Sequence, residues 1–293
     1  MVPAAAPLTQ RRRDLAERTR SLLARFRPAV RTEWGQHFLI DEGVLETILA
    51  TAALTDKDVV IEVGPGLGTL TEALLQRAGH VVAIERDRAY VRLLRQTLGQ
   101  DRRLTLVEGD VLESTPSALL AAAGLGDVPY QVVANLPYGI TAPTLRHFLE
   151  VGHKPTRLIV MLQREVALAI TAPPGQWSLL TVSVRFYADP VLVQVVPPSA
   201  FLPPPAVHSA IVAITVRPGP PPMDPAPFFT TVRAGFAAPR QQLRNSLARG
   251  LGIAPGEAGA LLELAGIDPK RRAETLSIDE WVALAHEVTE RGA

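Results

Sequence analysis

The chain contains no cysteine among its 293 residues. It therefore has no disulfide framework, no thiolate nucleophile and no cysteine-based zinc site. Its six histidines lack the H-x-E and H-E-x-x-H spacings of metal hydrolases, and the G-x-S-x-G turn of serine hydrolases is absent. No apolar run approaches the ~18 residues that a membrane span needs, and the N-terminus lacks the basic-then-apolar order of a secretory signal. We expect a cytoplasmic protein with no resident metal and no membrane partner.

The chain also lacks an excess of charge of either sign, since 30 basic residues face 29 acidic ones and the formal net charge is only +1. The arginines are nevertheless clustered. Residues 10–31 hold eight arginines against two acids, and residues 233–249 hold four arginines and no acid. Basic patches on a near-neutral protein suit docking on a phosphate backbone. Solvated helix faces are the alternative interpretation.

Strand-like and helix-like segments alternate from residue 58 onward. This alternation predicts a parallel sheet with helices on both faces, as in Rossmann-like α/β proteins. After a helix at about 164–172, the runs at 179–196 and 208–218 are interpreted as strands that close the sheet with an antiparallel pair. The expected parallel strands lie at 58–64, 80–87, 104–110, 130–138 and 156–163.

A proline-rich segment separates this pattern from the C-terminal part. Residues 217–227 carry six prolines in eleven positions, which predicts a stiff linker that is neither helix nor central strand. Everything beyond it is helix-like, and Ser277 with Glu280 offers a capping box. We expect a basic N-terminal extension at 1–30, an α/β domain at 31–217 and a small helical domain at 224–293.

A glycine-rich turn, "EVGPGLG", ends the first expected strand. Gly64, Gly66 and Gly68 would let a ligand approach bare backbone, but the third glycine comes one position too early for the dinucleotide fingerprint. The spacing after Glu62 instead resembles the S-adenosylmethionine loop of Rossmann-like methyltransferases. A turn without a ligand is the alternative for the loop taken alone.

Two acids follow the glycine turn at the ends of the next two strands. Glu85 stands at the ~20-residue offset where a carboxylate receives ribose hydroxyls. Asp110 closes the third strand, where it could accept a hydrogen bond from an adenine amino group. For either acid taken alone, a solvated strand end is the better interpretation. Together with the glycine turn they place three strand ends around one crevice, where doubly wound sheets bind ligands.

The fourth strand ends in "NLPY", Asn135 to Tyr138. An adenine exocyclic amine is a poor nucleophile, and a site can activate it by accepting its hydrogen bonds through the Asn135 side chain and the Leu136 carbonyl. Pro137 would fix the backbone, and Tyr138 would stack on the base, which is worth ~1–3 kcal/mol. The alternative is a structural Asn-x-Pro turn with a packed tyrosine.

With these motifs the chain resembles the small-subunit ribosomal RNA adenine-N6,N6-dimethyltransferases, the kasugamycin-sensitivity enzymes of bacteria. The matching stretches run in the family's order over about residues 30–290. They are "GQHFLID", "EVGPGLGTLT", "EGDVL", "NLPYGIT", "MLQREVA", "PPSAFLPPPAVHSAIV" and "RQQLRNSL".

The resemblance implies a role for each matching residue. His37, Leu39, Gly64, Gly66, Glu85, Asp110 and Asn135 would bind S-adenosylmethionine. Phe201 would face Tyr138 across the target base, in keeping with an extruded nucleotide. Arg240, Arg244 and Asn245 would contact RNA. A buried or capping histidine at 37 and a hydrophobic plug at 201 are the alternatives for those two residues.

The resemblance also implies a partner, 16S rRNA in the small ribosomal subunit or its precursor, and a monomeric enzyme. Some positions depart from the family pattern, namely Gly139, Ala206, His208 and Gln242, and they leave the details of RNA docking open. The Arg-rich extension is interpreted either as a compensating basic arm or as a disordered or wrongly started N-terminus.

Two other functions remain open on the sequence. One is a macrolide-resistance methyltransferase acting on 23S rRNA, in which isoleucine is more frequent at the position of Leu136. The other is a non-catalytic RNA-binding assembly factor of the same fold, against which the intact "NLPY" argues.

Overall fold

The computed structural model describes residues 8–32, 35–150, 152–219 and 221–291. It divides into two compact units, one made of residues 1–167 and 191–216 and the other of residues 168–190 and 217–293. None of the described helices is long and apolar enough to cross a membrane.

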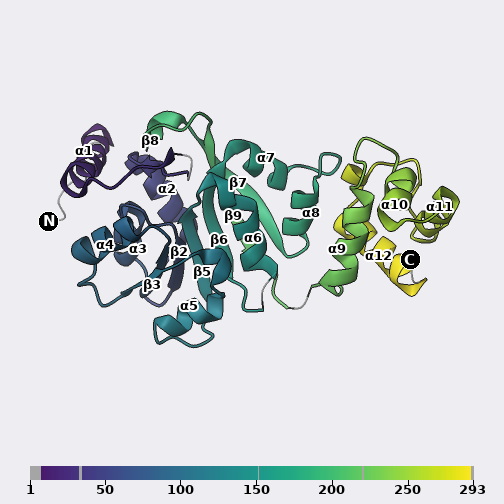
Figure 1. The fold of residues 1–293 in the computed structure, drawn as a ribbon, viewed down its shortest axis with the longest axis horizontal. Coiled ribbons are helices and arrows are strands. Elements are labelled where there is room, and N and C mark those ends of the chain that lie inside the picture. The colour runs from purple at the N-terminus through teal and green to yellow at the C-terminus, as the bar shows by residue number, and fades with distance from the viewer. Residues whose placement is uncertain (1–7, 33–34, 151, 220, 292–293) are drawn as a thin grey trace. The chain divides into compact units, whose positions relative to one another are not determined.

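The first unit is built on a seven-stranded sheet in the order β4-β3-β2-β5-β6-β9-β7 (Figure 1). Strands β4, β3, β2, β5 and β6 are parallel to one another, and β9 is antiparallel to β6. The strands are β2 (Val59–Val63), β3 (His80–Glu85), β4 (Leu104–Glu108), β5 (Tyr130–Asn135), β6 (Arg157–Gln163), β7 (Ala188–Val196) and β9 (Ser209–Val216). The predicted α/β class with an antiparallel end is confirmed.

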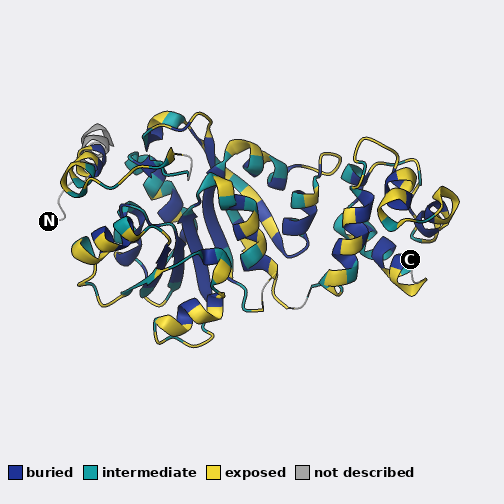
Figure 2. Cartoon of the chain, in the orientation of Figure 1, coloured by how far each residue is buried: buried dark blue, intermediate teal, exposed yellow. Residues whose placement is uncertain are grey.

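The central strands are apolar because helices cover the sheet, and Figure 2 shows them as buried. The helices of this part are α1 (Leu8–Phe26), α2 (Glu42–Ala52), α3 (Thr69–Leu75), α4 (Arg88–Thr97), α5 (Pro116–Ala122), α6 (Thr141–Glu150) and α7 (Arg164–Thr171), with 3₁₀ turns η2 (Val111–Glu113), η3 (Tyr138–Ile140) and η4 (Pro198–Ala200).

A separate two-stranded ribbon joins the N-terminal segment to a later loop. Strand β1 (Phe38–Leu39) pairs antiparallel with β8 (Phe201–Leu202), and this pairing sets Leu39 opposite Phe201. The ribbon therefore brings together the motifs "GQHFLID" and "PPSAFLPPPAVHSAIV".

The prediction of a strand over 179–196 is wrong in its first half. Residues Leu179–Arg185 form helix α8, and only Ala188–Val196 are strand β7. The β-branched residues there favour a strand, but Ser178 and Thr181 form a reciprocal capping box that starts a helix.

Helices α9 (Pro225–Gly235), α10 (Leu243–Leu251), α11 (Pro255–Leu264) and α12 (Ile278–Glu290), with η5 (Ala273–Thr275), form the C-terminal part. The last three residues of the expected linker are the first turn of α9, because Asp224 caps the helix and proline is tolerated in a first turn. The capping box of Ser277 and Glu280 at the start of α12 is confirmed.

Residues 168–190, which the sequence analysis assigned to the α/β domain, group with these helices. The Phe186 ring stacks on Phe228 with centroids 4.0 Å apart, and Phe229 packs edge-on against Phe186. An aromatic cluster of this kind supplies much of the buried apolar area of a small unit.

Candidate active site

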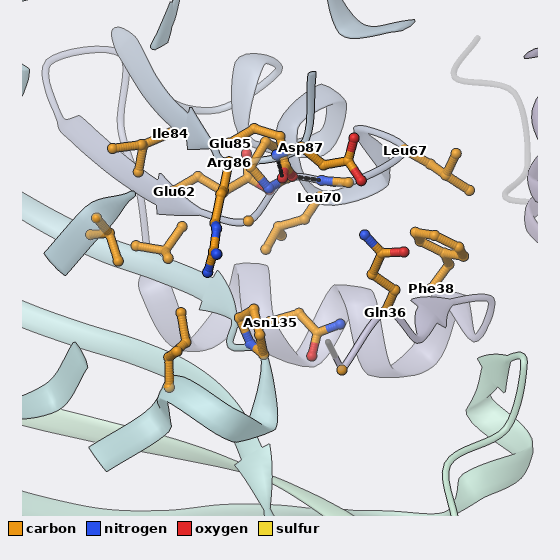
Figure 3. A pocket seen from close by; sticks show the side chains of 18 of the residues that line it. Gln36, Phe38, Glu62, Leu67, Leu70, Ile84, Glu85, Arg86, Asp87 and Asn135 are labelled. Carbon is orange, nitrogen blue, oxygen red and sulfur yellow. Dashed lines mark hydrogen bonds between the residues drawn. The ribbon is translucent and has the colours of Figure 1, made fainter. Parts of the chain in front are cut away.

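The carboxyl ends of four neighbouring strands open into one pocket. Gly64 and Gly66 follow β2, Glu85 ends β3, Asp110 follows β4, and Asn135 ends β5. All five line the pocket together with His37 and Leu39 from the N-terminal segment. Figure 3 shows Glu85, Arg86 and Asp87 on one side of this pocket and Asn135 on the other. The structure therefore brings together every residue that was predicted to bind the cofactor.

Two backbone amides hold the carboxylate of Glu85 in place. The Gly66 N–H donates to Oε2 at 3.1 Å and the Asp87 N–H donates to Oε1 at 2.8 Å. Burial raises the pKa of Glu85, and the amides of Asp87 and Gly66 oppose this shift. A carboxylate has about four lone-pair sites, so acceptor capacity remains on a group whose orientation is already fixed. This geometry fits a ligand with paired hydroxyl groups.

Asp110 stands at the next strand end and caps η2. Its Oδ1 accepts from the Leu112 N–H at 3.0 Å, and its Oδ2 lies 3.5 Å from Nη1 of Arg86. The Arg86 side chain is largely exposed and also lines the pocket. This end of the pocket presents an oriented carboxylate beside a cation, which suits a base that carries an amino group.

The glycine turn lets a ligand lie against backbone. Gly66 has a φ of +56°, and a Cβ built there would meet the Phe38 ring at 3.2 Å. A side chain would therefore be strained by its backbone and crowded by the ring. Behind the turn lies the buried side chain of Glu62. Its burial raises its pKa to about 8.

The Asn135 amide is oriented by the N-terminal segment. Its Nδ2 donates to the His37 carbonyl oxygen at 3.1 Å. Since only the amide nitrogen can donate to a carbonyl, Oδ1 is left as the acceptor end of the group. His37 is itself held, because its Nδ1 lies 2.8 Å from the Pro203 carbonyl oxygen and must donate to it.

The rest of the "NLPY" turn is equally constrained. The Leu136 N–H donates to Met161 O at 2.9 Å, and the Pro137 carbonyl accepts from the Ile140 N–H at 3.1 Å. The Tyr138 hydroxyl is bonded to Ser209 Oγ at 2.6 Å, and its ring stacks on His37 with centroids 5.7 Å apart. Burial raises the pKa of Tyr138, so the tyrosine is a neutral flat surface beside the pocket.

Phe201 packs behind Leu39, a residue of the pocket lining, but does not line the pocket itself. Its ring is 2% exposed and packs in the core with Leu39, Val196 and Ile211. In this conformation it offers no open face to a base, and its role opposite Tyr138 stays a prediction.

The three residues predicted to contact RNA lie in the second unit. Arg240 precedes α10, and Arg244 and Asn245 are in its first turn. All three are exposed. They form a polar group around the start of α10 and do not belong to the pocket.

Several residues that line the pocket were not singled out from the sequence. Among them are Gln36, Phe38, Arg86 and Asp87. Gln36 and Phe38 flank His37, Arg86 follows Glu85, and Asp87 lies two residues beyond Glu85. Asp87 caps α4, where its Oδ1 accepts from the Ala89 N–H at 2.9 Å. Ser209 carried no local signal, because its contact with Tyr138 depends on the sheet.

The sequence is similar to that of a known protein family and of several named proteins. The sequence profile of the family described as ribosomal RNA adenine dimethylase matches residues 28–290. A ribosomal RNA small subunit methyltransferase A from Dehalococcoides mccartyi strain CBDB1 is 51% identical over 258 residues, covering 86% of each chain. The protein of the same name from Anaeromyxobacter sp. strain K is 43% identical, covering 90% of this chain and 95% of that protein.

Solved structures give the same fold. A dimethyladenosine transferase from Plasmodium falciparum has a TM-score of 0.73 at 22% identity, covering 87% of this chain and 98% of that one. The 23S rRNA methyltransferase ErmE has a TM-score of 0.67 at 27% identity, covering 86% and 99%.

Proposed function

The chain belongs to the ribosomal RNA adenine dimethylase family, and on that premise we propose that it transfers methyl groups from S-adenosylmethionine to the N6 amines of two adjacent adenosines near the 3′ end of 16S rRNA. The observation that carries the proposal is the oriented side-chain amide of Asn135, a residue that lines the same pocket as the residues proposed to bind the cofactor. The two relatives named for the small subunit are 43–51% identical, well above the 27% of the large-subunit enzyme.

The residues of the pocket fit the proposed methyl donor. The Glu85 carboxylate, held by two amides, would accept the ribose hydroxyls, and Asp110 would accept from the adenine amino group. The bare backbone at Gly64 and Gly66 would admit the methionine portion. When bound, S-adenosylmethionine supplies an electrophilic methyl group on a positively charged sulfur.

Asn135 and Leu136 would prepare the adenine nitrogen for attack. The Asn135 Oδ1 and the Leu136 carbonyl accept hydrogen bonds from the N6 amine, which draws its lone pair out of conjugation with the ring. The His37 carbonyl and the Met161 carbonyl hold these two residues through hydrogen bonds that are made before the substrate arrives. Catalysis is then chiefly positioning and electrostatic preorganisation.

Tyr138 would hold the target base by stacking, which is worth ~1–3 kcal/mol. Its hydroxyl is anchored on Ser209, so the ring is fixed and loses little conformational entropy when a base arrives. The exposed Arg240, Arg244 and Asn245 would contribute the RNA contacts of the C-terminal helices.

The test uses purified small and large ribosomal subunits with labelled S-adenosylmethionine. We expect label in the small subunit, mapped to two adjacent adenosines, and Asn135→Ala should abolish methylation while the variant still binds the subunit. Gln194→Ala, an amide on β7 outside the pocket lining, is the control and should keep full activity. Label in the large subunit alone would overturn the proposal in favour of 23S rRNA.

A further inference from the structure

Helix α1 lies in the Arg-rich N-terminal extension, yet it has a buried face. Leu15, Ala16 and Thr19 are between 1% and 9% exposed. Leu22, Leu23 and Phe26 continue the same stripe at helical spacing and are partly buried. Arg18 pairs with Glu72 of α3, and Figure 1 shows α1 beside α2. An arm that only binds RNA through its arginines would not require a buried apolar face, so the stripe indicates that α1 packs on the folded domain.

The stripe of α1 packs behind the pocket wall. Its partners form one apolar cluster made of Phe38, Leu67, Tyr90, Leu93 and Leu94. Two of these, Phe38 and Leu67, line the pocket directly. Loss of the α1 contacts would therefore leave two pocket residues without support on their far side.

The residues after α1, here called the strap (27–32 and 35–37), continue along the pocket. The Arg31 guanidinium lies 3.2 Å from Oδ2 of Asp87, and the Arg31 N–H donates to the Gln36 side chain at 2.7 Å. The Tyr90 hydroxyl donates to the Ala29 carbonyl at 3.4 Å. Asp87 and Gln36 both line the pocket, so the strap ties two of its polar groups to α1.

The strap also meets the "NLPY" turn. Gly35 has a φ of +75°, and a Cβ there would lie 2.9 Å from the Tyr138 nitrogen. Beyond it, the carbonyl of His37 accepts from Asn135. The backbone of the strap is thus packed directly against the residues that would activate the adenine.

We propose that α1 and the strap are positioning elements of the cofactor pocket, and that Leu22, Leu23, Phe26 and Arg31 hold its wall in the conformation that binds the methyl donor. This inference rests on the proposed function of the pocket. The apparent affinity of a ligand falls in proportion to the fraction of protein in the competent conformation. Weakening the α1 contacts therefore lowers cofactor affinity without touching a residue that contacts the cofactor.

The experiment compares two variants of the full chain by calorimetric titration with S-adenosylhomocysteine and by binding to small ribosomal subunits. The packing variant carries Leu22→Ala, Leu23→Ala and Phe26→Ala. The charge variant carries Arg20→Glu, at an exposed position of α1. If the packing variant populates the competent conformation one tenth of the time, its affinity for the ligand falls ~10-fold, while its subunit binding stays unchanged. The charge variant should bind the ligand like the unmodified chain.

A milder pair of variants decides the matter if the packing variant does not fold. Arg31→Gln should raise the KM for S-adenosylmethionine and weaken S-adenosylhomocysteine binding, with a smaller effect on kcat. Arg31→Lys, which keeps the charge near Asp87, should restore most of the affinity. Equal ligand affinity in Arg31→Gln and the unmodified chain would overturn the inference, as would a packing variant that folds and binds the ligand normally. Failure of the unmodified chain to bind the ligand would instead overturn the proposed function.

Discussion

Glu62 makes the stability of this protein depend on pH in an unusual direction. Its side chain is 1% exposed at the pocket floor, and its Oε2 has no hydrogen-bond partner among the described residues. Burial raises its pKa from an ordinary 4.5 to about 8; the nearby Thr71 hydroxyl opposes the shift and the charge of Glu85 adds to it. At neutral pH the folded protein therefore holds a proton on this carboxyl that the unfolded chain has lost.

The free energy of unfolding must then fall as pH rises between these two values. The folded state binds one more proton than the unfolded state in that window, so each pH unit costs ~1.4 kcal/mol. Between pH 5.5 and pH 7.5 the loss amounts to about 3 kcal/mol. Below pH 4.5 the effect is absent, since both states are protonated, and above about 8 it is complete.

Glu62→Gln removes the titration while preserving the shape of the side chain. We expect the variant to gain stability relative to the unmodified chain as pH rises, and to match it most closely near pH 4.5. Urea unfolding of both proteins at pH 5.5, 6.5 and 7.5 gives the difference directly, and the shared titrations of other groups cancel. Parallel pH profiles for the two proteins would refute the reasoning, because Glu62 would then titrate alike in the folded and unfolded states.

The same carboxyl should report on the cofactor. A ligand that brings positive charge into the pocket favours the ionised form of Glu62, so binding at pH 7 should release a proton. Titration with S-adenosylmethionine in buffers of different ionisation enthalpy measures this release. It should be absent in Glu62→Gln. A variant that released as many protons as the unmodified chain would assign the titrating group elsewhere.

Three further changes test the structure at other places. Gly35→Ala should lower the melting temperature and methylation together, because its Cβ would meet the Tyr138 nitrogen at 2.9 Å at a φ of +75°; a normal melting temperature would contradict this. Phe201→Ala should cost ~3–5 kcal/mol in chemical unfolding, as core aromatic truncations do, whereas Phe201→Leu should fold and would lose methylation only if a base stacks on the ring. Arg271→Met should destabilise the C-terminal helices by at most ~1 kcal/mol, since it removes an ion pair between Arg271 and Glu280 that is partly exposed. Arg271 lowers the pKa of Glu280, so this loss should be present at pH 7 and vanish in unfolding curves taken well below pH 4.5.

The pocket was predictable because parallel strands fix where their last residues meet. Glu85, Asp110 and Asn135 each follow an apolar run, and the carboxyl ends of such strands share one edge of the sheet. Apart from the order of the strands in the sheet, predicting the pocket required no contact between distant parts of the sequence. Glycine at 64 and 66 added a backbone requirement that few other residues meet.

Features that depend on distant contacts were not predictable. A hydrophobic plug at Phe201 was one of two interpretations of the sequence, but no local pattern encodes the pairing with Leu39 or the core cluster that buries the ring. The stripe of α1 is visible at helical spacing, but the sequence does not say which surface covers it. Helix α8 was missed because Thr181 takes the capping position where glutamate or glutamine is the usual signal.

Three segments that are far apart in the sequence form one hydrogen-bonded unit at the site. The Pro203 carbonyl fixes the His37 ring, the His37 carbonyl fixes the Asn135 amide, and Ser209 fixes the Tyr138 hydroxyl. None of these contacts is strong alone, since a neutral hydrogen bond contributes ~0.5–1.5 kcal/mol net. Together they hold the Asn135 amide with its nitrogen on the His37 carbonyl, which leaves Oδ1 as the acceptor end of the group. The orientation of the Asn135 amide, on which the proposed activation of an adenine amine depends, is therefore set by the folded chain itself.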